Sequence, residues 1–174
     1  VYKRQTKAFT SSMAAFSSSW TLGTGKAVNW PSGVGAKGNA GVAAVIKKRE
    51  GAIGYLNQSY IRGSIKAAAL QNLAGEFVKP SVEAGAIALN QITLDQNLAG
   101  ENSNPSAPGA YPIATLTWVL AYERGNGPDT ATIKEVSNFM LSEEAQNVAP
   151  WLGFVPLRGD ILTKSKAALN KIGE

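Results

Sequence analysis

Apolar side chains recur at helical spacing in several stretches of the chain. Phe9, Met13 and Phe16 lie at i, i+4 and i+7, which predicts a helix over residues 6–17 with these three side chains in the core. The serines between them are expected to form its solvated face. The same periodicity predicts further helices over residues 40–49, 82–90, 130–141 and 161–172. The expected apolar side of residues 130–141 includes Val136 and Met140, and that of residues 161–172 includes Ile161 and Leu169.

Polar residues just before the helical stretches predict where these helices begin. The expected N-cap residues each carry a side-chain oxygen: Asn39, Ser81, Ser142 and Asp160. Such an oxygen accepts a hydrogen bond from one of the free backbone N–H groups of the first turn. Two adjacent carboxylates follow Ser142, and their place in a first turn explains them without an acid/base role.

Short apolar runs bounded by glycine or proline predict strands. Residues 28–30 and 52–56 flank the second predicted helix, and a strand–helix–strand unit this short implies parallel strands with a right-handed crossover. Residues 66–78 predict a hairpin with its turn near residues 74–75. The longest apolar run, residues 111–122, predicts a strand that crosses between two lobes. These elements indicate an α/β protein with a parallel-rich central sheet.

The loop before the second predicted helix contains glycines at G-x-G-x-x-G spacing: Gly33, Gly35 and Gly38. Such a loop binds dinucleotides when it makes a tight turn and an acidic residue follows the next strand. Here residues 30–32 lengthen the turn, residues 55–57 include no acidic residue, and no Lys-Ser or Lys-Thr follows as in a phosphate loop. We interpret the loop as structural and keep a dinucleotide-binding enzyme as an alternative.

Composition excludes several kinds of site. The 174 residues include no cysteine and no histidine, which removes disulfides, thiolate nucleophiles, histidine metal ligands and a Ser-His-Asp triad. The net charge of +5 is modest, and no basic stripe with interleaved aromatic residues indicates nucleic-acid binding. We therefore expect a binding protein without a cofactor or metal, and no enzyme.

Several blocks resemble the second lobe of periplasmic phosphate-binding proteins, the substrate receptors of the bacterial phosphate ABC transporter. The blocks recur in order over residues 6–174: Trp30-Pro31, residues 33–43, residues 51–55, residues 111–113 and residues 154–157. The resemblance implies a two-lobed α/β receptor that binds inorganic phosphate and delivers it to a membrane permease. It also implies export to the periplasm. Because no signal peptide is visible, the chain is expected to begin in the middle of a protein.

The resemblance also implies where the anion site should lie. In the family an Arg-x-Asp-Gly-Ser-Gly-Thr segment grips phosphate at the start of a helix, whose free N–H groups favour an anion. In this chain Lys3, Arg4 and Gln5 stand in place of the segment's Ser, Gly and Thr, and only Thr6 matches the small polar residue that follows. Thr6 is therefore the one candidate ligand residue. Residues 1–5 are interpreted as a non-native junction, and a divergent site using Lys3 and Arg4 is the alternative.

The predicted organisation follows from this resemblance. Residues 6–113 are expected to form the second lobe, and residues 114–174 are expected to return to the first lobe without its partner strands. The family's phosphate-binding aspartate, which discriminates against sulfate, has no match here. We therefore expect the isolated chain to bind phosphate weakly or not at all, with its unpartnered apolar faces exposed. A lobe for another oxyanion or small solute is the remaining alternative.

Overall fold

The computed structural model describes residues 3–173, and for Lys3 and Arg4 it describes the backbone alone. The chain divides into two compact units. Unit 1 comprises the described residues up to Gln91 together with Asn102–Thr115, and unit 2 comprises Ile92–Glu101 and Leu116–Glu174. Whether these units correspond to the two predicted lobes stays a prediction. None of the helices in the described part has the length and apolar character needed to cross a membrane.

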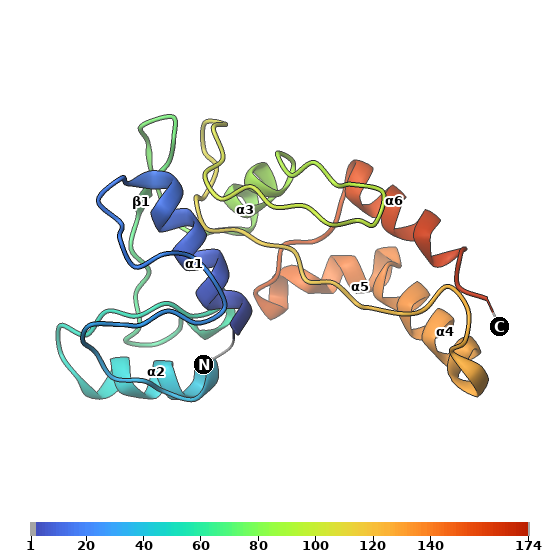
Figure 1. The fold of residues 1–174 in the computed structure, drawn as a ribbon, viewed down its shortest axis with the longest axis horizontal. Helices are drawn as coiled ribbons and strands as arrows, with labels where there is room; N and C mark the ends of the chain where they lie inside the picture. Colours follow the sequence, from blue (N-terminus) through green and yellow to red (C-terminus); the bar gives the residue numbers. More distant parts are fainter. Residues whose placement is uncertain (1–2, 174) are drawn as a thin grey trace. The chain divides into compact units, whose positions relative to one another are not determined.

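The described residues of unit 1 form three α-helices, one short 3-10 helix and a two-stranded sheet (Figure 1). Its elements are α1 (Lys3–Phe16), α2 (Gly38–Lys48), η1 (Gln58–Tyr60), β1 (Leu70–Gln71), β2 (Phe77–Val78) and α3 (Val82–Leu89). The predicted hairpin is confirmed: β1 and β2 pair antiparallel, with Leu70 opposite Val78. The turn is closed by the buried Asn72, whose side chain accepts the Glu76 N–H at 3.0 Å.

The predicted parallel sheet is not formed among the described residues. The β1–β2 pair is the one sheet there, and no ladder hydrogen bond joins residues 28–30 to residues 52–56. Residues 111–122 are likewise outside any strand. Ile53, expected in a buried strand, is 98% exposed. A run of β-prone residues becomes a strand only when a neighbouring backbone supplies the second half of the ladder, and the sequence pattern cannot supply that neighbour.

The buried face of α1 is polar, which corrects the predicted apolar core stripe. Phe16 is 51% exposed, whereas Thr6, Thr10 and Ser12 are buried. Burial of these hydroxyls is tolerable because each has a partner. Thr10 Oγ1 donates to the Thr6 carbonyl at 2.8 Å, and Ser12 Oγ donates to the Pro112 carbonyl at 3.3 Å. Small polar side chains thus let α1 approach other backbone closely.

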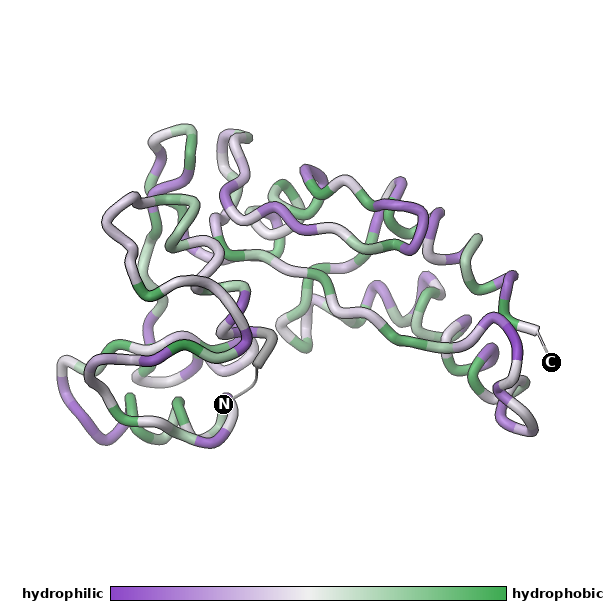
Figure 2. The backbone as a smooth tube through the Cα atoms, viewed as in Figure 1, coloured by the Kyte–Doolittle hydropathy of each residue, from purple (hydrophilic) through white to green (hydrophobic). Residues whose placement is uncertain are grey.

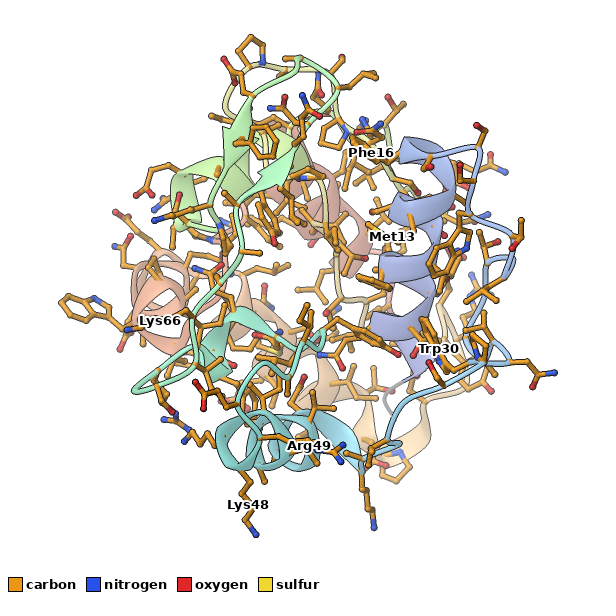
Figure 3. The ribbon with its side chains drawn as sticks, turned by 90° about the vertical axis from the view of Figure 1, so that its left-hand side faces the viewer. Met13, Phe16, Trp30, Lys48, Arg49 and Lys66 are labelled. Atoms are coloured by element: carbon orange, nitrogen blue, oxygen red, sulfur yellow. The ribbon has the colours of Figure 1, made fainter. Side chains whose placement is uncertain are left out.

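Aromatic rings gather beside α1. Phe9 stacks on Tyr55 with ring centroids 4.7 Å apart and planes at 12°. The ring centroid of Trp30 lies 6.4 Å from that of Phe9 and 6.0 Å from that of Trp20. Figure 3 shows Trp30 next to α1. Offset and edge-on arrangements at these distances are favourable beyond the apolar area they bury. The cluster fixes the segment around Tyr55 against the first half of α1.

α3 begins as its sequence predicts. The Ser81 hydroxyl accepts the Ala84 N–H at 3.0 Å and caps the helix. Hydrogen bonds from the backbone N–H of Glu83 and from the Ser81 side chain hold the pKa of the exposed Glu83 carboxyl below its usual value. A carboxylate in the first turn also complements the helix dipole.

As far as the structure describes it, unit 2 contains three α-helices and two short 3-10 helices: η2 (Gly127–Asp129), α4 (Thr130–Met140), α5 (Glu143–Val148), η3 (Ala149–Leu152) and α6 (Gly159–Leu169). α4 packs against both α5 and α6. The expected Ser142 cap is confirmed, since its hydroxyl accepts the Ala145 N–H at 3.2 Å. The buried Gln146 joins the end of α4 to the segment before α6, donating to the Met140 carbonyl and accepting the Leu157 N–H.

Two predictions about unit 2 are wrong. Asp160 is not an N-cap, because α6 begins at Gly159 and the Asp160 carboxylate instead pairs with Lys164 at 2.8 Å. Val136 and Met140 were expected on the buried side of α4, and both are exposed. Ile161 and Leu169 of α6 are buried as predicted. The periodicity therefore located the helices correctly but did not reveal which apolar faces would be covered.

Candidate functional site

The starts of α1 and α2 meet at one asparagine side chain. Gln5 Nε2, in the first turn of α1, donates to Asn39 Oδ1 at 2.7 Å. The Asn57 backbone N–H donates to the same oxygen at 2.9 Å. Figure 1 shows the two helix starts side by side. One carbonyl oxygen thus holds together segments 34 and 18 residues apart in sequence.

This role corrects the prediction that Asn39 is an N-cap. α2 begins at Gly38, its capping position is Lys37, and no side chain of the cap bonds to the helix. Gly38 has a φ of +64°, a backbone conformation that side chains with a Cβ rarely adopt. The helix therefore begins two residues before the predicted start at residue 40, and the Asn39 side chain makes tertiary contacts instead.

Thr6, the one predicted ligand residue, lies next to this junction. It is 1% exposed, and its hydroxyl is 2.9 Å from the Tyr55 hydroxyl. Tyr55 is in turn held by its stacking on Phe9. Thr6 therefore stands at the helix start where the resemblance places an anion, with its hydroxyl already engaged. Its role as a ligand stays a prediction.

The two helix starts carry the partial positive charge of a helix N-terminus. Neither α1 nor α2 has an acidic residue in its first turn. The first backbone N–H groups of a helix lack intrahelical acceptors and favour a nearby anion. Val1 and Tyr2 of the predicted junction lie outside the described residues, as do the side chains of Lys3 and Arg4. The backbone of Lys3–Gln5 continues α1 without a break.

Charge is distributed unequally between the two units. The sequence of unit 1 contains eleven Lys or Arg and three Asp or Glu, so its net charge is +8. Unit 2 contains six Lys or Arg and nine Asp or Glu, so its net charge is −3. Lys48 extends away from α2 in Figure 3. A field of this sign around the two helix starts attracts anions.

The glycine loop before α2 is open. Residues 31–35 are exposed, and a Cβ added at Gly35 would meet no atom within 4 Å. Gly33 has a φ of +118° and needs its freedom from a Cβ, whereas Gly35 has an ordinary φ. The described residues include no group of three or more acidic side chains placed to hold a metal ion.

Sequence reasoning singled out Thr6 but missed its neighbours. Gln5, Asn39, Tyr55 and Asn57 all take part in the hydrogen bonds around it. Asn57 contributes its backbone N–H, so no side-chain pattern could have indicated its role. The contact between the starts of α1 and α2 is a tertiary feature, so no periodic pattern in the sequence indicates it.

Comparison with known proteins identifies related sequences. The family model described as PBP superfamily domain matches residues 5–144. The chain is 34% identical over 97% of its length to the phosphate-binding protein PstS of Methanocaldococcus jannaschii, and 32% identical over 91% to that of Pasteurella multocida. It is 33% identical over 91% to the phosphate-binding protein PstS of Xylella fastidiosa. These matches confirm the resemblance inferred from the residues.

The matched regions cover only part of each relative. The chain spans about half the length of these proteins, between 45% and 49%.

Proposed function

The chain belongs to the PBP superfamily, and from this we propose that it supplies the second lobe and a returning segment of a receptor that binds inorganic phosphate for uptake by an ABC transporter. The observation that carries the proposal is that proteins named phosphate-binding protein match this chain over 91–97% of its length, with 32–34% identical residues. The relatives are named for binding and not for catalysis, so the proposed role includes no chemical step.

The charge and the helix starts of unit 1 support an anionic ligand. Two helix N-termini without acidic residues lie together in a unit of net charge +8. A desolvated oxyanion is best held by many fixed donors, and free backbone N–H groups supply such donors. Phosphate is the anion that the relatives' names indicate.

The isolated chain is expected to bind phosphate weakly or not at all. Thr6 is the one residue that matches the family's phosphate segment, and its hydroxyl is occupied by Tyr55. The aspartate and arginine of that segment have no counterpart in this sequence. The proposed receptor therefore needs residues outside the chain to complete its site. Its proposed location is the periplasm, and its proposed partner is the transporter's permease.

A chimera tests this function. Residues 6–174 would replace the matched segment of the M. jannaschii protein, and ligands would be compared by the shift in melting temperature, since only a ligand of the native state raises it. We expect phosphate to stabilise the chimera more than sulfate, molybdate or amino acids do. In the same chimera, Thr6→Ala should weaken phosphate binding about tenfold, as expected for one lost hydrogen bond to a charged group. The exposed Thr24→Ala is the matched control and should not change binding.

The same panel decides between the proposal and its alternatives. Preferential stabilisation by sulfate, molybdate or an amino acid would contradict phosphate and indicate a lobe for another solute. Stabilisation of the 174-residue chain by NAD or ATP, lost in Gly35→Val, would indicate a dinucleotide site. The structure makes this variant informative, because Gly35 has open space around it and an ordinary φ, so the substitution leaves the fold intact.

A further inference from the structure

The turn that leads into α4 is closed by one asparagine side chain. Asn126 Nδ2 donates to the Tyr122 carbonyl at 2.7 Å, and the Tyr122 N–H donates to Asn126 Oδ1 at 3.1 Å. These two hydrogen bonds form the Asn126 clamp. Figure 2 shows the hydrophilic character of the turn. Residues 121–125 are exposed and Asn126 is only partly buried, so water reaches the turn.

The closed turn also contacts the end of the described chain. The Glu123 carbonyl accepts the Gly173 N–H at 2.7 Å, and the Glu123 carboxylate lies 4.0 Å from Lys171 Nζ. Figure 1 shows the chain after α6 ending beside this turn. Glu123 lies between the two residues that the Asn126 clamp joins. The clamp therefore positions the carbonyl to which Gly173 bonds.

The residue after Asn126 is a glycine, and the two form the one Asn-Gly pair in the sequence. An asparagine loses its amide when the backbone nitrogen of the next residue attacks its side-chain carbonyl carbon. A Cβ on that next residue hinders the approach, and Gly127 has none. Gly127 has a φ of +59°, and a Cβ added there would meet no atom within 4 Å. In the part of the chain that the structure describes, the Gly127 N–H has no hydrogen-bond acceptor, so its nitrogen is available for this attack.

We propose that Asn126 is a deamidation site. The Gly127 backbone nitrogen forms a bond to Asn126 Cγ, and the bond from Cγ to Nδ2 breaks. The side-chain nitrogen leaves as ammonia and takes the proton of the Gly127 N–H. Water then opens the five-membered imide at either of its carbonyl groups, which gives aspartate or isoaspartate in place of Asn126. The reaction consumes water, releases ammonia and needs no oxidant or reductant.

Deamidation opens the Asn126 clamp. Both products carry a carboxylate in place of the amide, and a carboxylate has no proton to donate to the Tyr122 carbonyl. Two acceptor oxygens then face each other and repel. Isoaspartate in addition lengthens the backbone within the turn. The modified turn is therefore looser, and the contact between Glu123 and Gly173 weakens with it.

The unmodified 174-residue chain tests the site directly. The chain would be kept for several days at physiological temperature and neutral pH, and peptide mass spectrometry would follow the conversion of amide to acid at each asparagine. Asn97 is the internal control, because it is exposed but is followed by Leu98, which carries a Cβ. We expect Asn126 to react about tenfold faster than Asn97, with isoaspartate among the products.

Gly127→Asn is the matched variant for the attacking residue. It adds a Cβ where space is open, and asparagine adopts the left-handed conformation more readily than other residues with a side chain. The introduced asparagine cannot react in the same way, because the following Pro128 has no N–H. We expect this variant to keep the melting temperature of the parent and to deamidate Asn126 at about the rate of Asn97.

Asn126→Asp imitates one product and tests the effect on the turn. We expect hydrogen exchange of the Gly173 amide to become about fivefold faster, as for the loss of one hydrogen bond. Asn97→Asp adds the same charge to unit 2 without touching the Asn126 clamp and should leave this exchange unchanged.

Three results would overturn the proposal. Asn126 could react no faster than Asn97 in the folded chain, or only after unfolding in urea, which would show that the Asn126 clamp protects it. Gly127→Asn could react at the parent's rate, which would exclude the attack by the Gly127 nitrogen. Equal exchange of the Gly173 amide in Asn126→Asp and the parent would exclude the effect on the turn. None of these measurements involves phosphate, so their outcome is independent of the proposed function.

Discussion

Asn39 is the residue on which the junction of α1 and α2 depends. Its side-chain oxygen accepts hydrogen bonds from Gln5 and from the Asn57 backbone. Asn39→Ala leaves both donors without this acceptor, so we expect the free energy of unfolding to fall by about 1–3 kcal/mol. Asn39→Asp retains an acceptor oxygen and is the matched control. Denaturant unfolding of both variants measures the difference.

The comparison between these two variants is the critical one. An Asn39→Ala protein as stable as the parent would show that the two hydrogen bonds contribute nothing to the junction. Equal losses in Asn39→Ala and Asn39→Asp would show that the amide group, and not an acceptor oxygen, is what the site requires.

Tyr111 makes stability depend on pH in the alkaline range. Burial raises the pKa of the Tyr111 hydroxyl above its usual value of 10.0. A raised pKa in the folded state means that the neutral phenol is favoured there. Its contribution to stability is therefore complete below about pH 10 and is lost as the pH rises through the folded-state pKa.

Tyr111→Phe removes this dependence, because the variant has no proton to lose. We expect the difference in unfolding free energy between the parent and Tyr111→Phe to be constant up to about pH 9 and to shift against the parent above about pH 10. Urea unfolding at a series of pH values measures it. A difference that stays constant up to about pH 11 would show that burial of Tyr111 does not disfavour the phenolate.

At the scale of elements, Ser81 and Ser142 cap α3 and α5 in different units. Replacing either by alanine should cost about 1 kcal/mol, because one helix N–H loses its acceptor. We expect amides of α3 to exchange about fivefold faster in Ser81→Ala, and amides of α5 to do so in Ser142→Ala. Each variant serves as the control for the other. Equal acceleration of both helices in either variant would contradict the division into two units.

The helices and strands also show which structural features the sequence pattern can predict. Helical periodicity and the Ser81 and Ser142 caps located helices to within a few residues, because these signals are local. The β1–β2 hairpin was predictable for the same reason. The strand predictions for residues 28–30, 52–56 and 111–122 failed, because a strand depends on a neighbour that local composition does not specify.

The candidate site, too, could be predicted from the sequence only in part. Thr6 could be singled out because the resemblance aligned it with a known segment, and the glycine loop could be recognised from its spacing. The polar buried face of α1 and the bonds of Asn39 could not, since both depend on which backbone approaches the helix in three dimensions.

At the scale of the whole molecule, the two units differ in what they offer to other molecules. Unit 1 carries a net charge of +8 and two helix starts with no acidic residue in the first turn, which suit a small anion. Unit 2 carries a net charge of −3 and exposes large apolar side chains, among them Leu120 and Trp151. Because Thr6 is the one residue that matches the family's phosphate segment, we expect phosphate affinity to belong to the completed receptor.

Titration calorimetry with phosphate tests this most directly, comparing the 174-residue chain with the chimera that places residues 6–174 in the M. jannaschii protein. We predict a dissociation constant of about a micromolar or lower for the chimera, and binding at least a hundredfold weaker, or none, for the isolated chain. Binding of about micromolar affinity by the isolated chain would contradict the account, because residues 1–174 would then contain a complete site. No binding by the chimera would contradict the assignment to phosphate.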